Sequence, residues 1–193
     1  TRLQGDWSSD VCSSDLGNGA SKCVERCLPE QERTPEMINH GVEIQQRFYQ
    51  DAWRDGSSPY PGIEELLDGL AEQGILLAVL SNKDVRFTKE IITHFFDRHF
   101  QVVLGHSSDI PHKPDPTGAL RIAKALDLDP MTMAMVGDSA MDMETAVACK
   151  MQAVGVSWGF RTRQEIWSAG ADLILDDPLS LLHLQANAKG ETS

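Results

Sequence analysis

The sequence has few aromatic residues, few basic residues and no long apolar run. Aromatic residues occupy 6% of the 193 positions, and 17 Lys and Arg stand against 29 Asp and Glu, a formal charge of −12. Surfaces that bind nucleic acid or anionic membranes need clustered Lys and Arg, so this balance argues against both kinds of partner. No segment approaches the roughly 18 apolar residues of a membrane span, and the start lacks the layout of a signal peptide. We therefore expect a soluble cytoplasmic protein with one main domain.

Cysteine is also scarce, and its spacing excludes both a disulfide framework and a zinc site. Four cysteines are too few for a framework of disulfide bonds in a chain of this length. Cys23 and Cys27 lie four residues apart, but no second pair or histidine partner accompanies them. Cys149 falls within an expected helix, where we interpret it as a small buried apolar residue rather than a nucleophile.

The first sixteen residues do not resemble the rest of the chain. Residues 5–16 read GDWSSDVCSSDL, in which Ser-Ser-Asp occurs twice, and no helical or strand period is sustained there. The string resembles a translated sequencing adapter, and a polar disordered tail is the alternative. We exclude residues 1–16 from the fold prediction in either case.

Residues 17–58 are expected to be helical and to form a part of their own. Thr34-Pro35-Glu36 is a helix-start signal, and apolar residues follow it with helical spacing. Asp55-Gly56-Ser57-Ser58-Pro59 then breaks the chain. A second helix begins at Ile63 and stops at Gly74.

From residue 75 onward, short apolar runs alternate with helical patterns. This alternation predicts a doubly wound parallel α/β sheet with helices on both faces. In such sheets the ligand site lies at the carboxyl ends of the strands. The expected strands are residues 75–80, 101–104, 132–136, 153–156 and 172–175, and the expected helices are 85–95, 116–126, 141–150 and 162–169.

Polar residues suited to bind phosphate and a cation follow three of these strands. Ser81 and Asn82 offer a hydroxyl and an amide after the first strand, and Lys113 lies in a loop that flanking prolines stiffen. Asp138 and Asp142 lie four residues apart at a strand-to-helix turn, where two carboxylates can hold a hard cation such as Mg²⁺. Together these residues predict a site for phosphate and magnesium.

The histidines carry no such signal. His94, His99 and His106 follow no metal-ligand spacing, and we expect them at the surface or at helix ends.

The same residues carry a resemblance to a known family. Ser81-Asn82, Lys113-Pro114 and the run from Gly137 to Asp142 resemble the second, third and fourth motifs of the haloacid dehalogenase (HAD) superfamily. The resemblance covers residues 60–176, and the segment from Val154 to Phe160 is similar to one in phosphoglycolate phosphatases. It implies a HAD-like, Rossmann-like core at 59–185, a partial helical cap at 17–58 and a flexible tail at 186–193.

The resemblance also implies a mechanism and roles for the site residues. A HAD phosphatase uses Mg²⁺ and a nucleophilic aspartate, and it forms an aspartyl-phosphate that water hydrolyses. Asp138 is then the metal ligand, with Asp142 in support through water or through Lys113. Lys113 and Ser81 stabilise the transferring phosphoryl group, and Asn82 helps to orient it. The implied substrate is a small phosphomonoester, foremost 2-phosphoglycolate. The implied protein is a monomer or weak homodimer of carbohydrate metabolism and DNA repair.

One motif of the family is missing. The chain has no Asp-x-Asp-Gly-Thr, and Asp6, Asp10 and Asp15 neither follow an apolar strand nor precede Gly-Thr. In the family this motif ends the first strand, which is the middle strand of the sheet and would lie between the strands that end here at Leu80 and Val136. We therefore expect an N-terminally truncated phosphatase that is inactive as written. The alternatives are another small-molecule HAD phosphatase, a sugar-phosphate mutase relative, and a non-catalytic phosphate-binding regulatory module.

Overall fold

The computed structural model describes residues 20–184, and the chain divides into two compact units between Ser57 and Ser58. No helix in the described range is long and apolar enough to cross a membrane.

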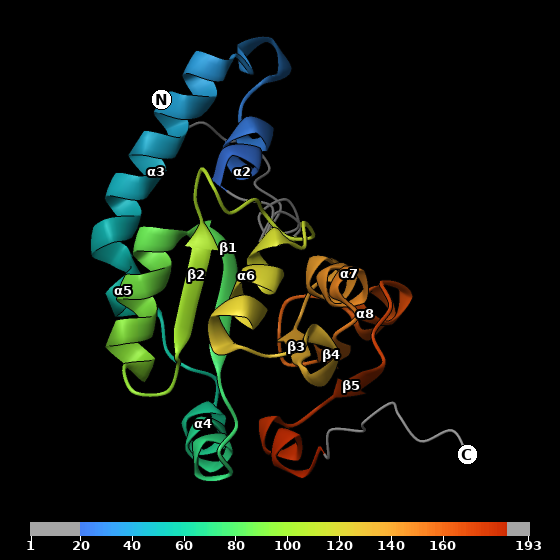
Figure 1. The fold of residues 1–193 in the computed structure, drawn as a ribbon. Helices are drawn as coiled ribbons and strands as arrows, with labels where there is room; N and C mark the ends of the chain where they lie inside the picture. Colours follow the sequence, from blue (N-terminus) through green and yellow to red (C-terminus); the bar gives the residue numbers. More distant parts are fainter. Residues whose placement is uncertain (1–19, 185–193) are drawn as a thin grey trace. The chain divides into compact units, whose positions relative to one another are not determined.

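The first unit consists of helices, as the sequence predicts. It contains α2 (Ala20–Cys27), the short 3-10 helix η1 (Glu30–Glu32) and α3 (Pro35–Gly56), shown in Figure 1. Thr34 begins α3, because its side-chain oxygen accepts a hydrogen bond of 3.2 Å from the backbone N–H of Met37. The helix-start signal at Thr34 is thus confirmed.

The second unit begins with α4 (Ile63–Glu72) and a sheet of two parallel strands. The strands are β1 (Ala78–Asp84) and β2 (Val102–His106), joined through α5 (Val85–Phe96). α5 and α6 (Thr117–Leu126) both pack against this sheet and lie on opposite sides of it in Figure 1.

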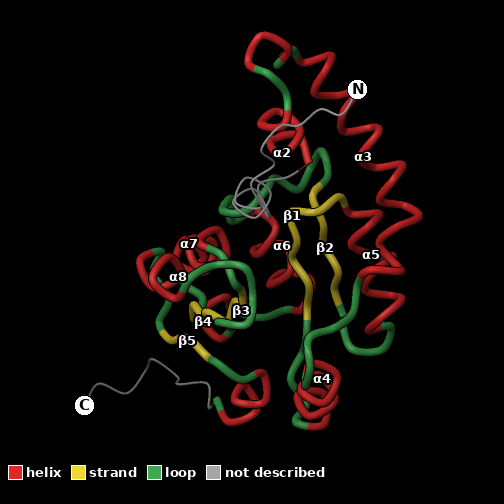
Figure 2. Tube along the Cα trace, turned by 180° about the vertical axis from the view of Figure 1, so that it is seen from behind, coloured by secondary structure: helices red, strands yellow, loops and turns green. Residues whose placement is uncertain are grey.

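A second sheet follows, again with parallel strands only. Its order is β3 (Ala134–Gly137), β4 (Gln152–Val156) and β5 (Leu173–Leu175). α7 (Ala140–Cys149) and α8 (Arg163–Ser168) pack on it, and Figure 2 shows both sheets from behind. Two short 3-10 helices complete the described chain, η2 (Pro130–Thr132) and η3 (Pro178–His183).

The α/β class and the parallel strands are confirmed, but the strands form two sheets instead of one. Within residues 20–184, β1 pairs only with β2 and β3 pairs only with β4, so β1 and β3 each have an open edge. Val136 on β3 is 42% exposed, although an apolar residue of a central strand is normally buried. The division falls between the two strands that the sequence analysis places beside the missing strand.

The first strand starts later than predicted. Ile75 and Leu76 are each about half exposed (48% and 47%) and precede β1, which runs on to Asp84. Gly74 has a φ of 73°, which turns the chain after α4, and the backbone N–H of Leu77 donates to the Gln101 side chain rather than to a strand. Ser81 and Asn82 therefore lie within β1 and not after it.

The third predicted strand also starts late, for a comparable reason. The Asp129 side chain accepts from the backbone N–H of Met131 and begins η2, so β3 starts only at Ala134.

The core of the second sheet consists of small and apolar residues from α6, α7, α8 and β4. Ile166 and Met143 have no exposed surface, and Gly155 on β4 lies directly against the Ile166 side chain. Cys149 is 6% exposed and belongs to this core, as predicted, and burial raises the pKa of its thiol. The buried cluster comprises Ala119, Ala123, Met143, Ala146, Cys149, Met151, Ala153 and Ile166.

We predict that Ile166→Ala lowers the free energy of unfolding by about 2–5 kcal/mol, because it leaves a cavity under β4. Trp167→Ala, one position along the same helix and 60% exposed in the wild type, should change it by no more than about 0.5 kcal/mol. Urea unfolding followed by circular dichroism measures both. Equal losses for the two variants would show that this core does not stabilise the unit.

Candidate active site

Lys113 is the centre of a polar cluster between β1 and the first turn of α7. Its ammonium donates to the carbonyl oxygen of Leu80 at 3.0 Å and to Asp142 Oδ1 at 2.5 Å. The side chains of this ion pair are only 13% and 7% exposed. A buried pair of charges is favourable only when further hydrogen bonds satisfy both groups, and the surroundings of this pair provide them.

Asn82 holds the backbone of Lys113 in place. Asn82 Oδ1 accepts from the Lys113 backbone N–H at 2.6 Å, and Nδ2 donates to the Lys113 carbonyl oxygen at 3.2 Å. Nδ2 also lies 3.5 Å from the sulfur of Met141, at the start of α7. The side chain is 8% exposed. The sequence analysis expects Asn82 to orient phosphate, whereas these contacts direct its amide to Lys113.

Asp142 acts on Lys113 and on the start of α7. Its Oδ2 accepts from the Ser139 hydroxyl at 2.6 Å and from the Ser139 backbone N–H at 3.1 Å, which forms a capping box. Its Oδ1 accepts from Lys113. Both carboxylate oxygens of Asp142 thus accept hydrogen bonds from the protein. Asp142 therefore supports the Lys113 side chain.

Asp138 has a different environment. Its Oδ2 accepts a hydrogen bond of 2.9 Å from the backbone N–H of Phe160, in the loop that follows β4. Ser81, the remaining expected site residue, accepts from the Lys83 backbone N–H at 3.1 Å. The structure thus joins Asn82, Lys113 and Asp142 by direct contacts and gives Ser81 and Asp138 other partners.

Among the described residues, a single carboxylate, that of Asp138, fits as a ligand of a magnesium ion. No group of three or more His, Cys, Asp or Glu side chains in residues 20–184 could hold a metal. Asp138 has one oxygen bonded to a backbone N–H, which leaves the other for a cation. Mg²⁺ commonly takes one or two carboxylates and completes its shell with water and substrate phosphate, so Asp138 fits as one ligand.

An apolar pocket adjoins Asp138. Its volume is about 320 Å³, and its walls come from α4, β3, β4 and the loop after β4. Val136, Val156 and Trp158 line it beside Asp138, together with Ile63 and Leu66.

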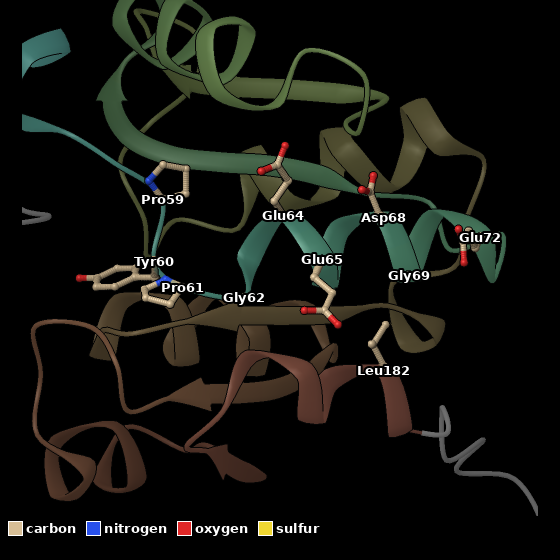
Figure 3. A pocket seen from close by; sticks show the side chains of 10 residues that line it. All are labelled: Pro59, Tyr60, Pro61, Gly62, Glu64, Glu65, Asp68, Gly69, Glu72 and Leu182. Atoms are coloured by element: carbon tan, nitrogen blue, oxygen red, sulfur yellow. The ribbon is translucent and has the colours of Figure 1, made fainter.

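A larger groove of about 830 Å³ lies along α4 and is acidic (Figure 3). Glu64, Glu65, Asp68 and Glu72 line it, and Leu182 lies across from them. None of the expected site residues lines this groove.

His99 corrects an expectation, because it is buried rather than at the surface. It is 5% exposed, and its Nε2 lies 2.8 Å from Asp68 Oδ1, which also accepts from Arg98. The hydrogen bond with His99 and the charge of Arg98 lower the pKa of Asp68. The contact of His99 with Asp68 connects the segment after α5 to α4. The two residues are distant in the sequence, so the local spacing of histidines does not predict this contact.

His106, the last residue of β2, stacks on His112 in the loop that carries Lys113. The rings of His106 and His112 lie 3.6 Å apart, and His106 Nδ1 lies 2.9 Å from the Ile110 carbonyl oxygen. Burial of His112, and secondarily the charge of His106, lowers the pKa of His112. Sequence reasoning missed this pair because the two residues are six positions apart and meet only when the loop folds back.

Comparisons with known proteins agree on one family. The model of the family described as haloacid dehalogenase-like hydrolase matches residues 5–156. A phosphoglycolate phosphatase of Psychrobacter arcticus is 31% identical over 176 residues, which cover 87% of this chain and 76% of that protein. A phosphoglycolate phosphatase of Pseudomonas putida is 28% identical over 171 residues, which cover 86% of this chain and 63% of that protein.

Solved structures show the same fold. A crystal structure described as a predicted phosphoglycolate phosphatase from Haemophilus somnus superposes with a TM-score of 0.82 at 27% identity, covering 91% of this chain and 81% of the other. A β-phosphoglucomutase from Clostridium difficile superposes with a TM-score of 0.75 at 19% identity, over 90% and 78% of the chains, a likeness of fold alone.

We predict that Asn82→Ala lowers the free energy of unfolding by about 2 kcal/mol, because it leaves a partly buried N–H and C=O of Lys113 without the partners that Asn82 provides. The matched control is Ser107→Ala, which removes an exposed hydroxyl bonded to Asp109 and should cost at most about 0.5 kcal/mol. Urea unfolding compares the two. A loss for Asn82→Ala no larger than that of the control would contradict the role of this side chain.

We predict that His112 makes the protein less stable in mild acid. Its pKa is lower in the folded than in the unfolded chain, so the unfolded state binds its proton first and stability falls as the pH falls through about 6.5. Melting temperatures between pH 7.5 and 5 should fall less for His112→Gln than for the wild type. His183→Gln, at an exposed histidine, should retain the wild-type slope. Parallel slopes for all three proteins would refute the prediction.

Proposed function

The chain belongs to the haloacid dehalogenase-like hydrolase family, and from this premise we propose that it is a Mg²⁺-dependent phosphatase that converts 2-phosphoglycolate to glycolate and phosphate. Relatives named as phosphoglycolate phosphatases, one of them 31% identical, support this choice of substrate.

One observation carries the proposal: the buried Lys113 side chain, whose ammonium donates to Leu80 and Asp142 while Asn82 holds the backbone of the same residue. An ammonium has three N–H donors, and the two contacts described leave one for a phosphoryl oxygen. A rigidly held charge stabilises the phosphoryl group in the transition state without reorganising. Ser81 and Lys113 are the proposed catalytic and substrate-binding residues, and Asn82 supports Lys113.

Asp138 is the proposed ligand of Mg²⁺. A bound Mg²⁺ supplies positive charge that offsets repulsion between a carboxylate and a phosphate dianion. Asp142 contributes indirectly, because its two oxygens hold Lys113 and Ser139.

The nucleophile of the proposed reaction is an aspartate, which forms an aspartyl-phosphate. The 193 residues contain no Asp-x-Asp-Gly-Thr, and within residues 20–184 β1 and β3 each have an unpaired edge that could pair with one more strand. We propose that such a strand completes the site and that residues 17–58 are part of a cap. The polypeptide of these 193 residues is then inactive by itself. The expectations for residues 1–16 and 186–193 lie outside the described residues.

A second candidate function is phosphate binding without turnover. The fixed position of the Lys113 ammonium favours this function. A phosphate site without a nucleophile can bind phosphate but cannot hydrolyse a phosphomonoester. A different small phosphomonoester, or a sugar-phosphate mutase reaction, stays open for the completed site, because fold alone does not fix the substrate.

We predict that the chain releases no phosphate from 2-phosphoglycolate. A version in which an apolar strand ending in Asp-x-Asp-Gly-Thr replaces residues 1–16 should show Mg²⁺-dependent turnover and a sharper thermal transition. In that version Lys113→Ala should lower kcat about 10²–10³-fold, and Asp138→Asn should lower both rate and Mg²⁺ affinity.

Exposed residues supply the controls for these variants. Lys89→Ala and Asp97→Asn remove the same charges away from the site and should retain full activity. Mg²⁺-dependent turnover by the 193-residue chain would contradict the need for an added nucleophile. A completed version that melts cooperatively and binds phosphate without hydrolysing it would favour the binding function.

A further inference from the structure

We propose that the loop from Ser157 to Phe160 is the positioning element for Asp138. Gly159 and the backbone N–H of Phe160 fix the orientation of the Asp138 carboxylate. The proposal rests on the function proposed above, in which Asp138 is the ligand of Mg²⁺.

The loop reaches Asp138 because of the strand order. Asp138 directly follows β3, the loop directly follows β4, and the last pair in the register of these parallel neighbours is Gly137 and Gly155. The loop after β4 therefore lies next to the end of β3, and the Phe160 N–H donates to Asp138 Oδ2 at 2.9 Å.

Gly159 lies directly on the Asp138 side chain. A Cβ atom at position 159 would overlap both the carboxylate and the Cβ of Asp138. Gly159 is not among the glycines with a positive φ, which are Gly62, Gly74 and Gly170. The need for glycine is thus a matter of space and not of backbone conformation. Because Asp138 Cβ is one of the overlapping atoms, a larger residue at 159 would displace the whole side chain.

Contacts independent of Asp138 hold the loop at both ends. Ser157 donates through its hydroxyl to Asp176 Oδ1 at 2.6 Å, and its backbone N–H donates to the Leu175 carbonyl oxygen at 3.0 Å. On the other side, Thr162 and Glu165 form a capping box that begins α8. The loop is therefore a fixed surface on which the Asp138 side chain rests.

The same arrangement distinguishes the two acidic residues of the site. A Cβ at Gly137 would overlap Asp142, so each carboxylate rests on a glycine. Asp142 has partners on both oxygens, whereas the contact with Phe160 engages Asp138 through Oδ2. A hydrogen bond to one oxygen orients the other for a cation, as outer-shell partners of metal ligands do.

A double-mutant cycle tests whether Gly159 acts through Asp138. The 193-residue protein, Gly159→Ala, Asp138→Gly and the double variant are compared by thermal melting. Gly159→Ala should lower Tm by about 3–6 °C in the wild type and by about 1 °C or less in the Asp138→Gly background, which lacks both the carboxylate and the Cβ that the new methyl group would overlap. Equal losses in both backgrounds would overturn the proposal.

Mg²⁺ titration supplies a measurement that a purely structural role would leave unchanged. Gly159→Ala should weaken the calorimetric Kd for Mg²⁺ about tenfold, the scale of lost outer-shell support. Gly69→Ala is the matched control, because its added Cβ meets Leu182 Cδ2 at 2.7 Å away from the site and should leave the Kd unchanged. A Kd that stays unchanged in Gly159→Ala would overturn the positioning role.

Variants at position 160 test the same proposal if Gly159→Ala does not fold. Phe160→Ala retains the backbone N–H and should keep the wild-type Kd, while Phe160→Pro removes it and should weaken binding. Equal Kd values for these two variants would contradict the proposal. Coupling in the melting cycle without Mg²⁺ binding by any protein would instead contradict the metal role of Asp138 in the proposed function.

Discussion

The buried ion pair of Lys113 and Asp142 is the contact on which the rest of the site depends. The two sheets share no ladder hydrogen bonds in the described chain, since β1 and β3 are not paired. Lys113 contacts Leu80 in the first sheet and Asp142 on the helix that follows β3. Asn82 spans the same division through Met141. The polar cluster that suits phosphate chemistry therefore also connects the two sheets, so a loss of either charge would disturb both.

The sequence predicts the fold well because its signals are local and repeated. Apolar runs that alternate with helical patterns indicate parallel strands joined by helices, and the cap at Thr34 marks a helix start. The predicted start of a strand is wrong where a turn, or a contact with a residue distant in the sequence, determines where the strand begins. Residues 75–77 are apolar but lie outside β1, because Gly74 turns the chain and Leu77 pairs with the Gln101 side chain.

The site shows the same limit at the level of single residues. Motif order indicates that Asn82, Lys113 and Asp142 belong to one site, but it does not say that the Asn82 amide faces the Lys113 backbone. Burial of His99 and the stack of His106 on His112 depend on partners that are distant or meet through a folded loop. The space that Gly159 leaves for Asp138 is visible only once β3 and β4 lie side by side.

The charges of the site explain why the proposed reaction would require a divalent cation. Lys113 and Asp142 neutralise each other at 2.5 Å, so the carboxylate of Asp138 leaves this group of three with one net negative charge. A phosphomonoester dianion would be repelled by that charge, and the repulsion is strong where water is scarce. A divalent cation on Asp138 would reverse the sign to one net positive charge while Lys113 stays fixed. In the proposed reaction the two carboxylates would thus have separate tasks: Asp142 holds the Lys113 ammonium, and Asp138 would hold a divalent cation from solution.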